Sequence, residues 1–233
     1  MSCLCAPVSS NAQSTSSGYA VSVRELQIPP KARREYNKGL ESLARQGAEG
    51  SLPHFQAAIA EYPGYYEAYD RIGAADLQLW RIAEAEQAFR KSIEVSGGGY
   101  ARPLLALGAI LDDHKNFAEA ANVIRKGLDL APESINGYYY LGRALFGLNH
   151  LEEAESNARE ALRRKLNFPS VHLLLADIHG RRKDYDSLMA DLNEYLKLAP
   201  DGPASEWARN VREAVQRMIA ESQSATVFAA PQP

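Results

Sequence analysis

Apolar and small residues recur along this chain at the spacing of paired helices. From Tyr66 the pattern places Ile72 and Gly73 together, and then Ala85 and Phe89 well beyond them, which a single amphipathic helix does not require. The same spacing begins again at four other places: Ala32, Ala101, Ile135 and Pro169. Successive starts lie about 34 residues apart, an interval typical of helical repeats. The pattern therefore predicts repeated pairs of antiparallel helices.

We divide residues 31–202 into five such units, each with a helix A followed by a helix B. The units span 32–65, 66–99, 101–134, 135–168 and 169–202, and Tyr100 is a one-residue insertion between the second and the third. Position 8 of a unit is small because helix A presses there against helix B, and Ala at position 20 serves the same approach. Phe or Ile at position 24 is expected to fill the gap between successive units. Pro at position 32 ends helix B because it cannot continue the hydrogen-bond ladder.

These positions resemble the pattern of the tetratricopeptide repeat (TPR) family. The resemblance covers roughly residues 32–202 and is most specific in the second, third and fourth units. The first unit departs from it with Lys38 at position 7 and Ser51 at position 20, and the fifth departs with Leu188 at position 20. The resemblance implies an all-α fold, a right-handed superhelical solenoid whose A helices line a concave surface.

The segments that flank the repeats have different compositions. Residues 1–30 are rich in polar residues at their start and are expected to be disordered or extended. Residues 203–222 predict a C-terminal capping helix that covers the open end of the last unit, through the apolar stripe Trp207, Val211, Val215, Met218 and Ile219. Residues 223–233 are expected to form a flexible tail.

Composition excludes several classes of protein. The chain is 45% hydrophobic and 24% charged, which is typical of a soluble globular protein. A net charge of −3 lacks the basic footprint of a nucleic-acid binder, and the absence of a long apolar run argues against membrane insertion. Cys3 and Cys5 are the only cysteines, so no disulfide framework is expected. We expect a cytoplasmic protein by default, or a periplasmic one if the chain is a fragment of a longer protein.

No motif in the sequence indicates catalysis. The chain lacks a phosphate-binding glycine loop, a nucleophile elbow and a zinc-protease motif, so we predict no enzyme activity and no cofactor. His172 and His179 fall seven residues apart on packing positions of one helix, whereas a metal pair normally needs a spacing of four and further ligands. Packing histidines are therefore the better interpretation, and no metal site is predicted.

The resemblance to TPR proteins also implies which side chains face the groove, namely those at positions 2, 5, 9, 12 and 13 of helix A. The candidate peptide-binding residues include charges of both signs, apolar side chains and aromatic side chains. They are Tyr36, Asp70, Arg102, Leu105, Asp112, Tyr139, Arg143, Phe146, Leu173 and Asp177.

Tyr139 and Phe146, on either side of Arg143, are not required by the repeat, and such residues often anchor recognition sites. Alternatively, the two aromatic residues cover the apolar surface of the neighbouring unit or of the N-terminal segment. The Lys and Asn with which one TPR subclass grips a peptide carboxylate are replaced here by Tyr36 and Leu40.

The sequence thus predicts a non-catalytic scaffold that binds a protein or peptide in its groove and is a monomer or a weak homodimer. Two alternatives stay open: a self-associating assembly module, and an accessory domain of a longer bacterial protein. The stretch before the first unit looks similar to the lead-in of TPR proteins from soil bacteria.

Overall fold

The structure, a computed structural model, describes residues 27–228, with side chains from 27 to 221, and contains ten helices and no strand in that range. Most of the predicted N-terminal segment 1–30 lies outside the described residues. The helices are α2 (Pro30–Glu61), α3 (Tyr66–Gln78), α4 (Ile82–Val95), α5 (Ala101–Asp113), α6 (Phe117–Leu130), α7 (Ile135–Gly147), α8 (Leu151–Arg164), α9 (Pro169–Arg182), α10 (Tyr185–Leu198) and α11 (Ser205–Phe228).

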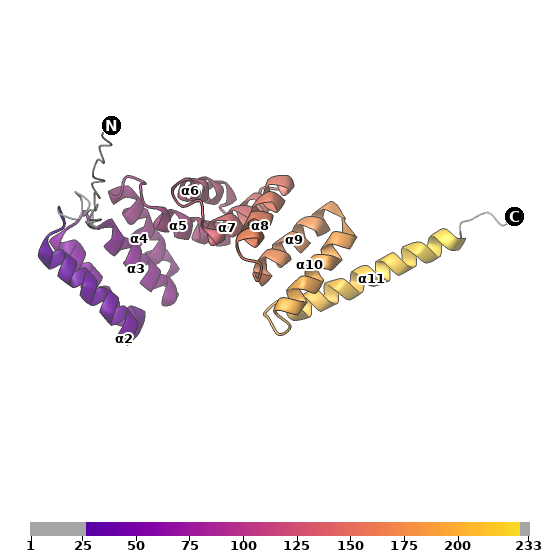
Figure 1. Cartoon of the computed structure of the whole chain (residues 1–233), viewed down its shortest axis with the longest axis horizontal. Coiled ribbons are helices and arrows are strands. Elements are labelled where there is room, and N and C mark those ends of the chain that lie inside the picture. The colour runs from indigo at the N-terminus through magenta and orange to yellow at the C-terminus, as the bar shows by residue number, and fades with distance from the viewer. Residues whose placement is uncertain (1–26, 229–233) are drawn as a thin grey trace, which may run out of the picture.

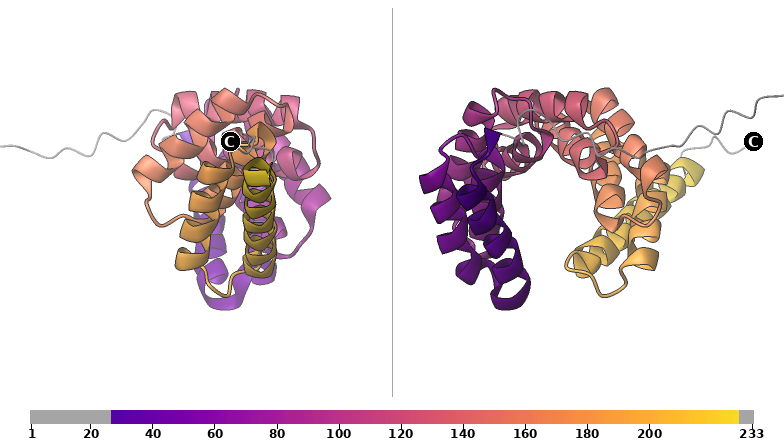
Figure 2. Two further views of the ribbon diagram at one scale, coloured as in Figure 1. Left: turned by 90° about the vertical axis from the view of Figure 1, so that its right-hand side faces the viewer. Right: turned by 60° about the vertical axis from the view of Figure 1, so that its left-hand side comes forward.

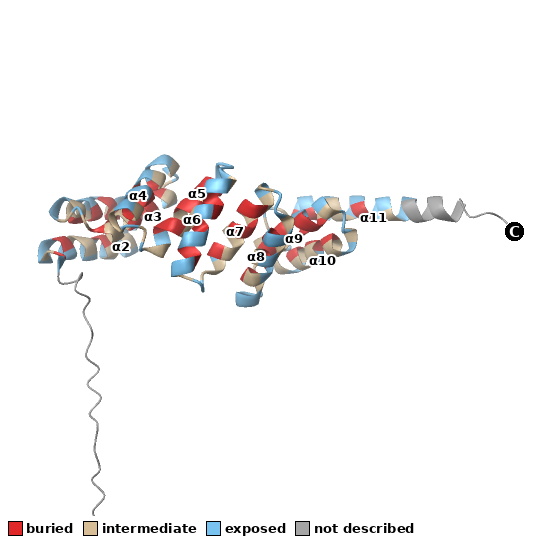
Figure 3. Cartoon of the chain, turned by 90° about the horizontal axis from the view of Figure 1, so that it is seen from above, coloured by how far each residue is buried: buried red, intermediate tan, exposed pale blue. Residues whose placement is uncertain are grey.

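The helices stack in chain order along an arch, with α2 at one end and α11 at the other (Figures 1 and 2). Each of the unit ranges from 66 to 202 holds one helix pair: α3 with α4, α5 with α6, α7 with α8, and α9 with α10. The main core runs through the middle units, from Ala85 on α4 to Ile178 on α9. Seen from above, the buried residues follow the contacts between consecutive helices (Figure 3). The fold is therefore an all-α solenoid.

The two helices of a unit meet where a glycine faces a large side chain. A Cβ atom added to Gly73 would lie 2.8 Å from Phe89, and one added to Gly108 would lie 2.2 Å from Cγ1 of Ile124. These pairs join positions 8 and 24 of the same unit. Residue 24 therefore fills the space over the glycine of its own unit, and not only a gap between successive units as the sequence suggested.

In units two to five the turn between helix A and helix B has the same backbone. Trp80, Lys115, Asn149 and Lys183 all adopt a left-handed conformation, with φ between 60° and 63°. In each turn the amide of the following residue donates a hydrogen bond to a carbonyl five residues back, for example Asn116 N to Leu111 O at 2.8 Å. This is the Schellman arrangement that ends helices. The repeated turn sets the antiparallel return of helix B.

The first unit makes its turn differently. Helix α2 contains both helices of the unit, joined by a kink at Gly47, whose φ of 79° lies in the left-handed region. Ser51 replaces the usual small apolar residue at position 20, but it is buried and its hydroxyl donates to the carbonyl of Ala48 at 2.7 Å. The polar residue is accommodated because the local backbone supplies its acceptor.

Helix α11 packs on α10 and extends past it (Figure 1). It continues to Phe228, beyond the predicted end at 222, and the sequence has no helix breaker before Pro231. Val215 is buried, with Val211 and Ile219 beside it, as the stripe predicts. Trp207 and Met218 are 44% and 39% exposed, so the predicted apolar stripe is wider than the face of α11 that is buried. The buried face is narrower because only α10 lies against it.

The contact between Ile124 and Gly108 provides a test of this packing. Gly108→Ala should lower the free energy of unfolding by on the order of 2 kcal/mol, because the new methyl group overpacks the contact between helices A and B. This destabilisation exceeds the stabilisation expected from the higher helix propensity of alanine. Chemical denaturation of Gly108→Ala, Ile124→Ala and the double variant measures this. The double variant should lose less than the sum of the single losses, and simple additivity would contradict the proposed contact.

Candidate functional site

Two adjoining hollows lie on the face formed by the A helices, and together we call them the groove. The C-terminal hollow, about 610 Å³, lies among α5, α7 and α9 and is lined by six predicted residues: Asp112, Tyr139, Arg143, Phe146, Leu173 and Asp177. The N-terminal hollow, about 550 Å³, lies among α3, α5 and α7 and is lined by three more: Asp70, Arg102 and Leu105. Each volume falls in the range of ligand sites. The structure thus brings together nine of the ten candidate residues.

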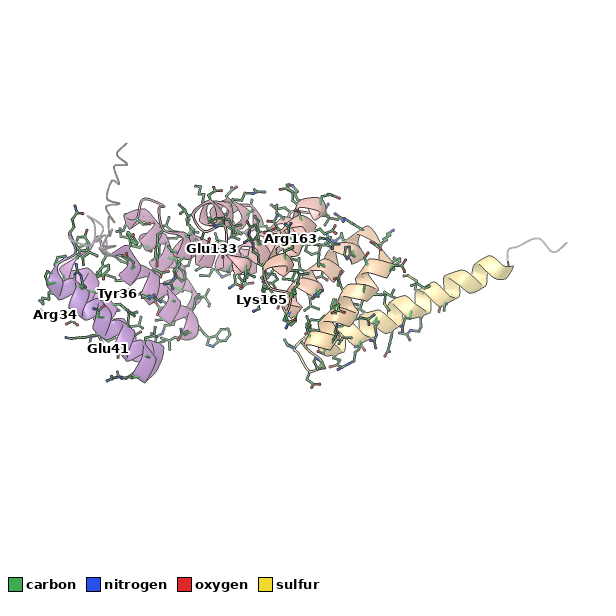
Figure 4. The ribbon with its side chains drawn as sticks, viewed as in Figure 1. Arg34, Tyr36, Glu41, Glu133, Arg163 and Lys165 are labelled. Carbon is green, nitrogen blue, oxygen red and sulfur yellow. The ribbon has the colours of Figure 1, made fainter. Side chains whose placement is uncertain are left out.

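The tenth residue, Tyr36, lies apart from the groove on α2, at the N-terminal end of the arch (Figure 4). Its ring stacks on Tyr65 with centroids 4.8 Å apart, and its hydroxyl accepts a hydrogen bond from Nε of Arg71 at 3.3 Å. The hydrogen bond from Arg71 joins the first unit to the second, whereas Tyr65 belongs to the first unit itself. Tyr36 therefore packs at an interface between units and lines neither hollow.

Groove charges pair between consecutive units. Arg102 of the third unit lies 3.2 Å from the buried carboxylate of Asp70 in the second. Arg143 of the fourth unit lies 3.0 Å from both Asp112 and Asp113 of the third. Burial raises the pKa of Asp70, with Arg102 opposing the shift. These pairs hold neighbouring A helices in register, so part of the mixed charge is explained by stacking alone.

Asp112 is the exceptional group of the groove. Its side chain is 1% exposed, and neither carboxylate oxygen accepts a hydrogen bond, although Arg143 Nε lies close to one of them. The contact is an ion pair without an aligned N–H donor. Burial raises the pKa of Asp112 to about 6, which Arg143 only partly opposes. Buried polar groups are normally hydrogen-bonded, so a carboxylate in this state needs an explanation.

Tyr139 and Phe146 line the C-terminal hollow and also pack against the core. Both are half-buried, and the ring of Tyr139 lies 5.0 Å from that of Phe168. The guanidinium of Arg181 lies 4.7 Å over the ring of Phe146. The two interpretations of this pair are therefore compatible, because each ring covers neighbouring residues with one part and faces the hollow with another.

Sequence reasoning missed several residues of the C-terminal hollow. Lys115 enters it from the turn between α5 and α6, Phe117 from the first residue of α6, and Ser170 from the start of α9. A search limited to groove positions of helix A does not reach the turn, which the left-handed residue at Lys115 brings to the rim. The sequence carries no clear signal for Lys115, because position 15 of units two to five holds different residue types: Trp80, Lys115, Asn149 and Lys183.

The histidines of α9 belong to a packing network. Nδ1 of His172 and Nδ1 of His179 lie 3.1 Å and 2.8 Å from the two carboxylate oxygens of Asp191 on α10. Among the described residues, no group of three His, Cys, Asp or Glu side chains is arranged to hold a metal ion. In the same part of the chain, no helix combines the length and the apolar character needed to cross a membrane.

The geometry can be compared with known proteins. No family model matches the chain, and no curated protein matches it in sequence. Among solved structures, MamA from Desulfovibrio magneticus RS-1, residues 41 to the end, aligns with a TM-score of 0.66 and 20% identity over 76% of this chain and 99% of that one. YrrB, described as a TPR protein with an unusual peptide-binding site, aligns with a TM-score of 0.66 and 15% identity over 81% and 95%.

The chain has the tetratricopeptide-repeat fold. PilF of Pseudomonas aeruginosa is also similar, with a TM-score of 0.60 and 18% identity over 82% of this chain and 91% of that one. At these identities the likeness concerns the superhelical arrangement of helix pairs. The TPR solenoid accounts for the face on which the groove residues gather, because side chains of successive A helices line one side of the stack.

The raised pKa of Asp112 predicts a pH dependence of stability. Between its ordinary value of 3.8 and about 6, the folded chain keeps a proton that the unfolded chain releases. The free energy of unfolding therefore falls as pH rises through this window, by on the order of 3 kcal/mol. Asp112→Asn removes this titration, while all other groups are common to the two proteins and cancel in the difference.

Urea denaturation of the wild type and of Asp112→Asn at pH 4 and pH 7 provides the measurement. The wild type should be more stable relative to the variant at pH 4 than at pH 7. A stability difference that is the same at both pH values would show that Asp112 titrates normally.

Proposed function

We propose that this TPR solenoid is a non-catalytic scaffold that binds a protein or peptide in its groove, with Tyr139 and Phe146 as anchors. The convergence of nine candidate residues on two adjoining hollows carries this proposal. Aromatic and arginine side chains are the residues that most often contribute binding energy at interfaces. The groove offers arginine side chains on α5, α7 and α9, and aromatic side chains on α7.

The open geometry of the groove favours an extended ligand. Asp113 and Tyr140 line the N-terminal hollow, while their sequence neighbours Asp112 and Tyr139 line the C-terminal one. A bound chain that crosses α5 and α7 would therefore place successive side chains in the two hollows. YrrB, which has the same fold, is described as having a peptide-binding site, and this supports a peptide as the ligand here.

We further infer a bacterial protein that acts as a monomer or a weak homodimer. The similar structures from Desulfovibrio magneticus and Pseudomonas aeruginosa support the bacterial origin. Among the described residues, three of the five large exposed apolar side chains lie on different elements, which fits a monomer, whereas Trp207 and Met218 share one face of α11, which fits a weak homodimer. The five side chains are Trp80, Leu130, Leu166, Trp207 and Met218.

Peptides selected from a random phage-displayed library on the immobilised chain test the function. We expect synthetic copies of the selected peptides to bind the wild type, and Tyr139→Ala/Phe146→Ala to weaken binding at least tenfold by removing the anchors. Fluorescence anisotropy measures Kd, and circular dichroism checks that the double variant keeps its helices.

Leu166→Ala is the matched control, because Leu166 is 78% exposed in the loop between α8 and α9 and lines neither hollow. It should leave Kd unchanged. Equal affinity of the folded double variant and the wild type would refute the groove as the binding site. Unfolding of the double variant would instead assign the two rings a structural role.

A further inference from the structure

The C-terminal hollow contains an acceptor whose hydrogen-bond capacity is unused. Asp112 lines this hollow, is almost completely buried, and accepts no hydrogen bond at either carboxylate oxygen. An ionised carboxylate has about four acceptor positions, and leaving them empty inside a protein is unfavourable. Arg143 lies 3.0 Å from one of these oxygens but donates no aligned N–H, whereas a cationic donor aimed directly at Asp112 would compensate the buried charge better.

Arg143 is placed so that it can leave Asp112 without losing its own partner. Its terminal nitrogen donates a hydrogen bond to Asp113 at 3.0 Å, whereas its Nε forms an ion pair with Asp112 at 3.0 Å without an aligned hydrogen bond. The side chain of Asp113 is 65% exposed, so the Arg143–Asp113 pair can move outward together. The guanidinium of Arg143 also lies 5.9 Å and 5.7 Å from the ring centroids of Tyr139 and Tyr140, so these contacts and Asp113 would remain if Asp112 took another partner.

The rest of the hollow offers a second acceptor. Asp177 on α9 lines the same hollow and is exposed to solvent. Its pKa is raised by desolvation, which Arg181 opposes. Arg181 donates instead to Oδ1 of Asn149 and stacks over Phe146. Two carboxylates therefore line the hollow, Asp112 buried and Asp177 exposed, next to aromatic rings that suit an alkyl or guanidinium group.

We propose that the C-terminal hollow takes a lysine or arginine side chain of the bound peptide, whose cationic head displaces Arg143 from Asp112 and reaches Asp177. This inference rests on the proposed function and specifies the chemistry of its ligand. The nearest rival is an acidic ligand that binds Lys115, Arg143 and Arg181, which line the same hollow. A basic ligand competes with Arg143 for Asp112, whereas an acidic ligand needs Arg143 as a binding partner.

Variants of Arg143 and Asp112 separate the two classes. For a peptide selected as above, Asp112→Asn should weaken binding at least tenfold, because a charged hydrogen bond is lost while the shape of the side chain is kept. Arg143→Met should preserve or tighten binding, because it removes the competing cation. Anisotropy titrations at pH 8 are appropriate, since Asp112 must be ionised. Asp113→Asn is the matched control, because it removes the exposed partner of the same arginine; it should change Kd less than Asp112→Asn.

A change in the peptide gives a readout that does not depend on folding of a protein variant. Replacing the selected lysine by norleucine, or the selected arginine by citrulline, should weaken binding to the wild type tenfold or more. The replacement should have little effect on binding to Asp112→Asn, whose carboxylate is already absent.

Three outcomes would overturn the inference. The first is selection of groove-binding peptides that carry no basic residue, and the second is binding to Asp112→Asn as tight as to the wild type. Loss of binding in folded Arg143→Met would favour the acidic ligand. If no selected peptide depends on Tyr139 and Phe146, the proposed function itself fails and the inference falls with it. The results therefore distinguish a wrong ligand class from a wrong binding site.

Discussion

The close approach of helix A to helix B at a glycine determines the rest of this structure. At Gly73 and Gly108 the facing side chain occupies the volume that a Cβ atom would need. The contact brings the helix axes close together, so that each pair is thin and successive pairs can stack with a small rotation. In the fourth unit position 24 is Ala158, and the backbone around Ala154 together with Leu174 of the next unit takes the space beside Gly142. Helices A and B of the fourth unit therefore also approach closely, although backbone atoms and a side chain of the next unit fill the space instead of residue 24.

Stacking and ligand binding share the same side chains in the groove. Arg102 and Arg143 each pair with a carboxylate of the preceding unit, so their charges hold neighbouring A helices together. The rings of Tyr139 and Phe146 similarly pack on the core with one part and line the C-terminal hollow with another. A ligand in the groove would therefore contact three units at once. Binding would stabilise their relative orientation by mass action, because each pairwise interface in a solenoid is small.

Much of the architecture could be predicted because it depends on local rules. Small residues at position 8, and proline at Pro63, Pro132 and Pro200, mark helix contacts and helix ends directly in the sequence. The turns were not foreseen, because Trp80 and Lys115 are not residue types that indicate a left-handed backbone. Tyr36 lines neither hollow because its ring packs on Tyr65 and its hydroxyl pairs with Arg71 at the first unit, contacts that the repeat pattern does not show. Lys115 and Phe117 were missed because the groove includes the turn and the first residue of α6.

The state of Asp112 could not be predicted, because burial depends on how three consecutive A helices meet. In the sequence, Asp112 and Asp113 are equivalent acids, yet the structure buries one and exposes the other. Folding alone favours an apolar or a hydrogen-bonded side chain at such a position, and a buried carboxylate without donors lowers stability. Departures of this kind from the rules of packing concentrate at functional sites, where a ligand completes the interaction. The buried carboxylate of Asp112, which accepts no hydrogen bond, is therefore the strongest physical reason to look for the binding site of a partner between α5 and α9.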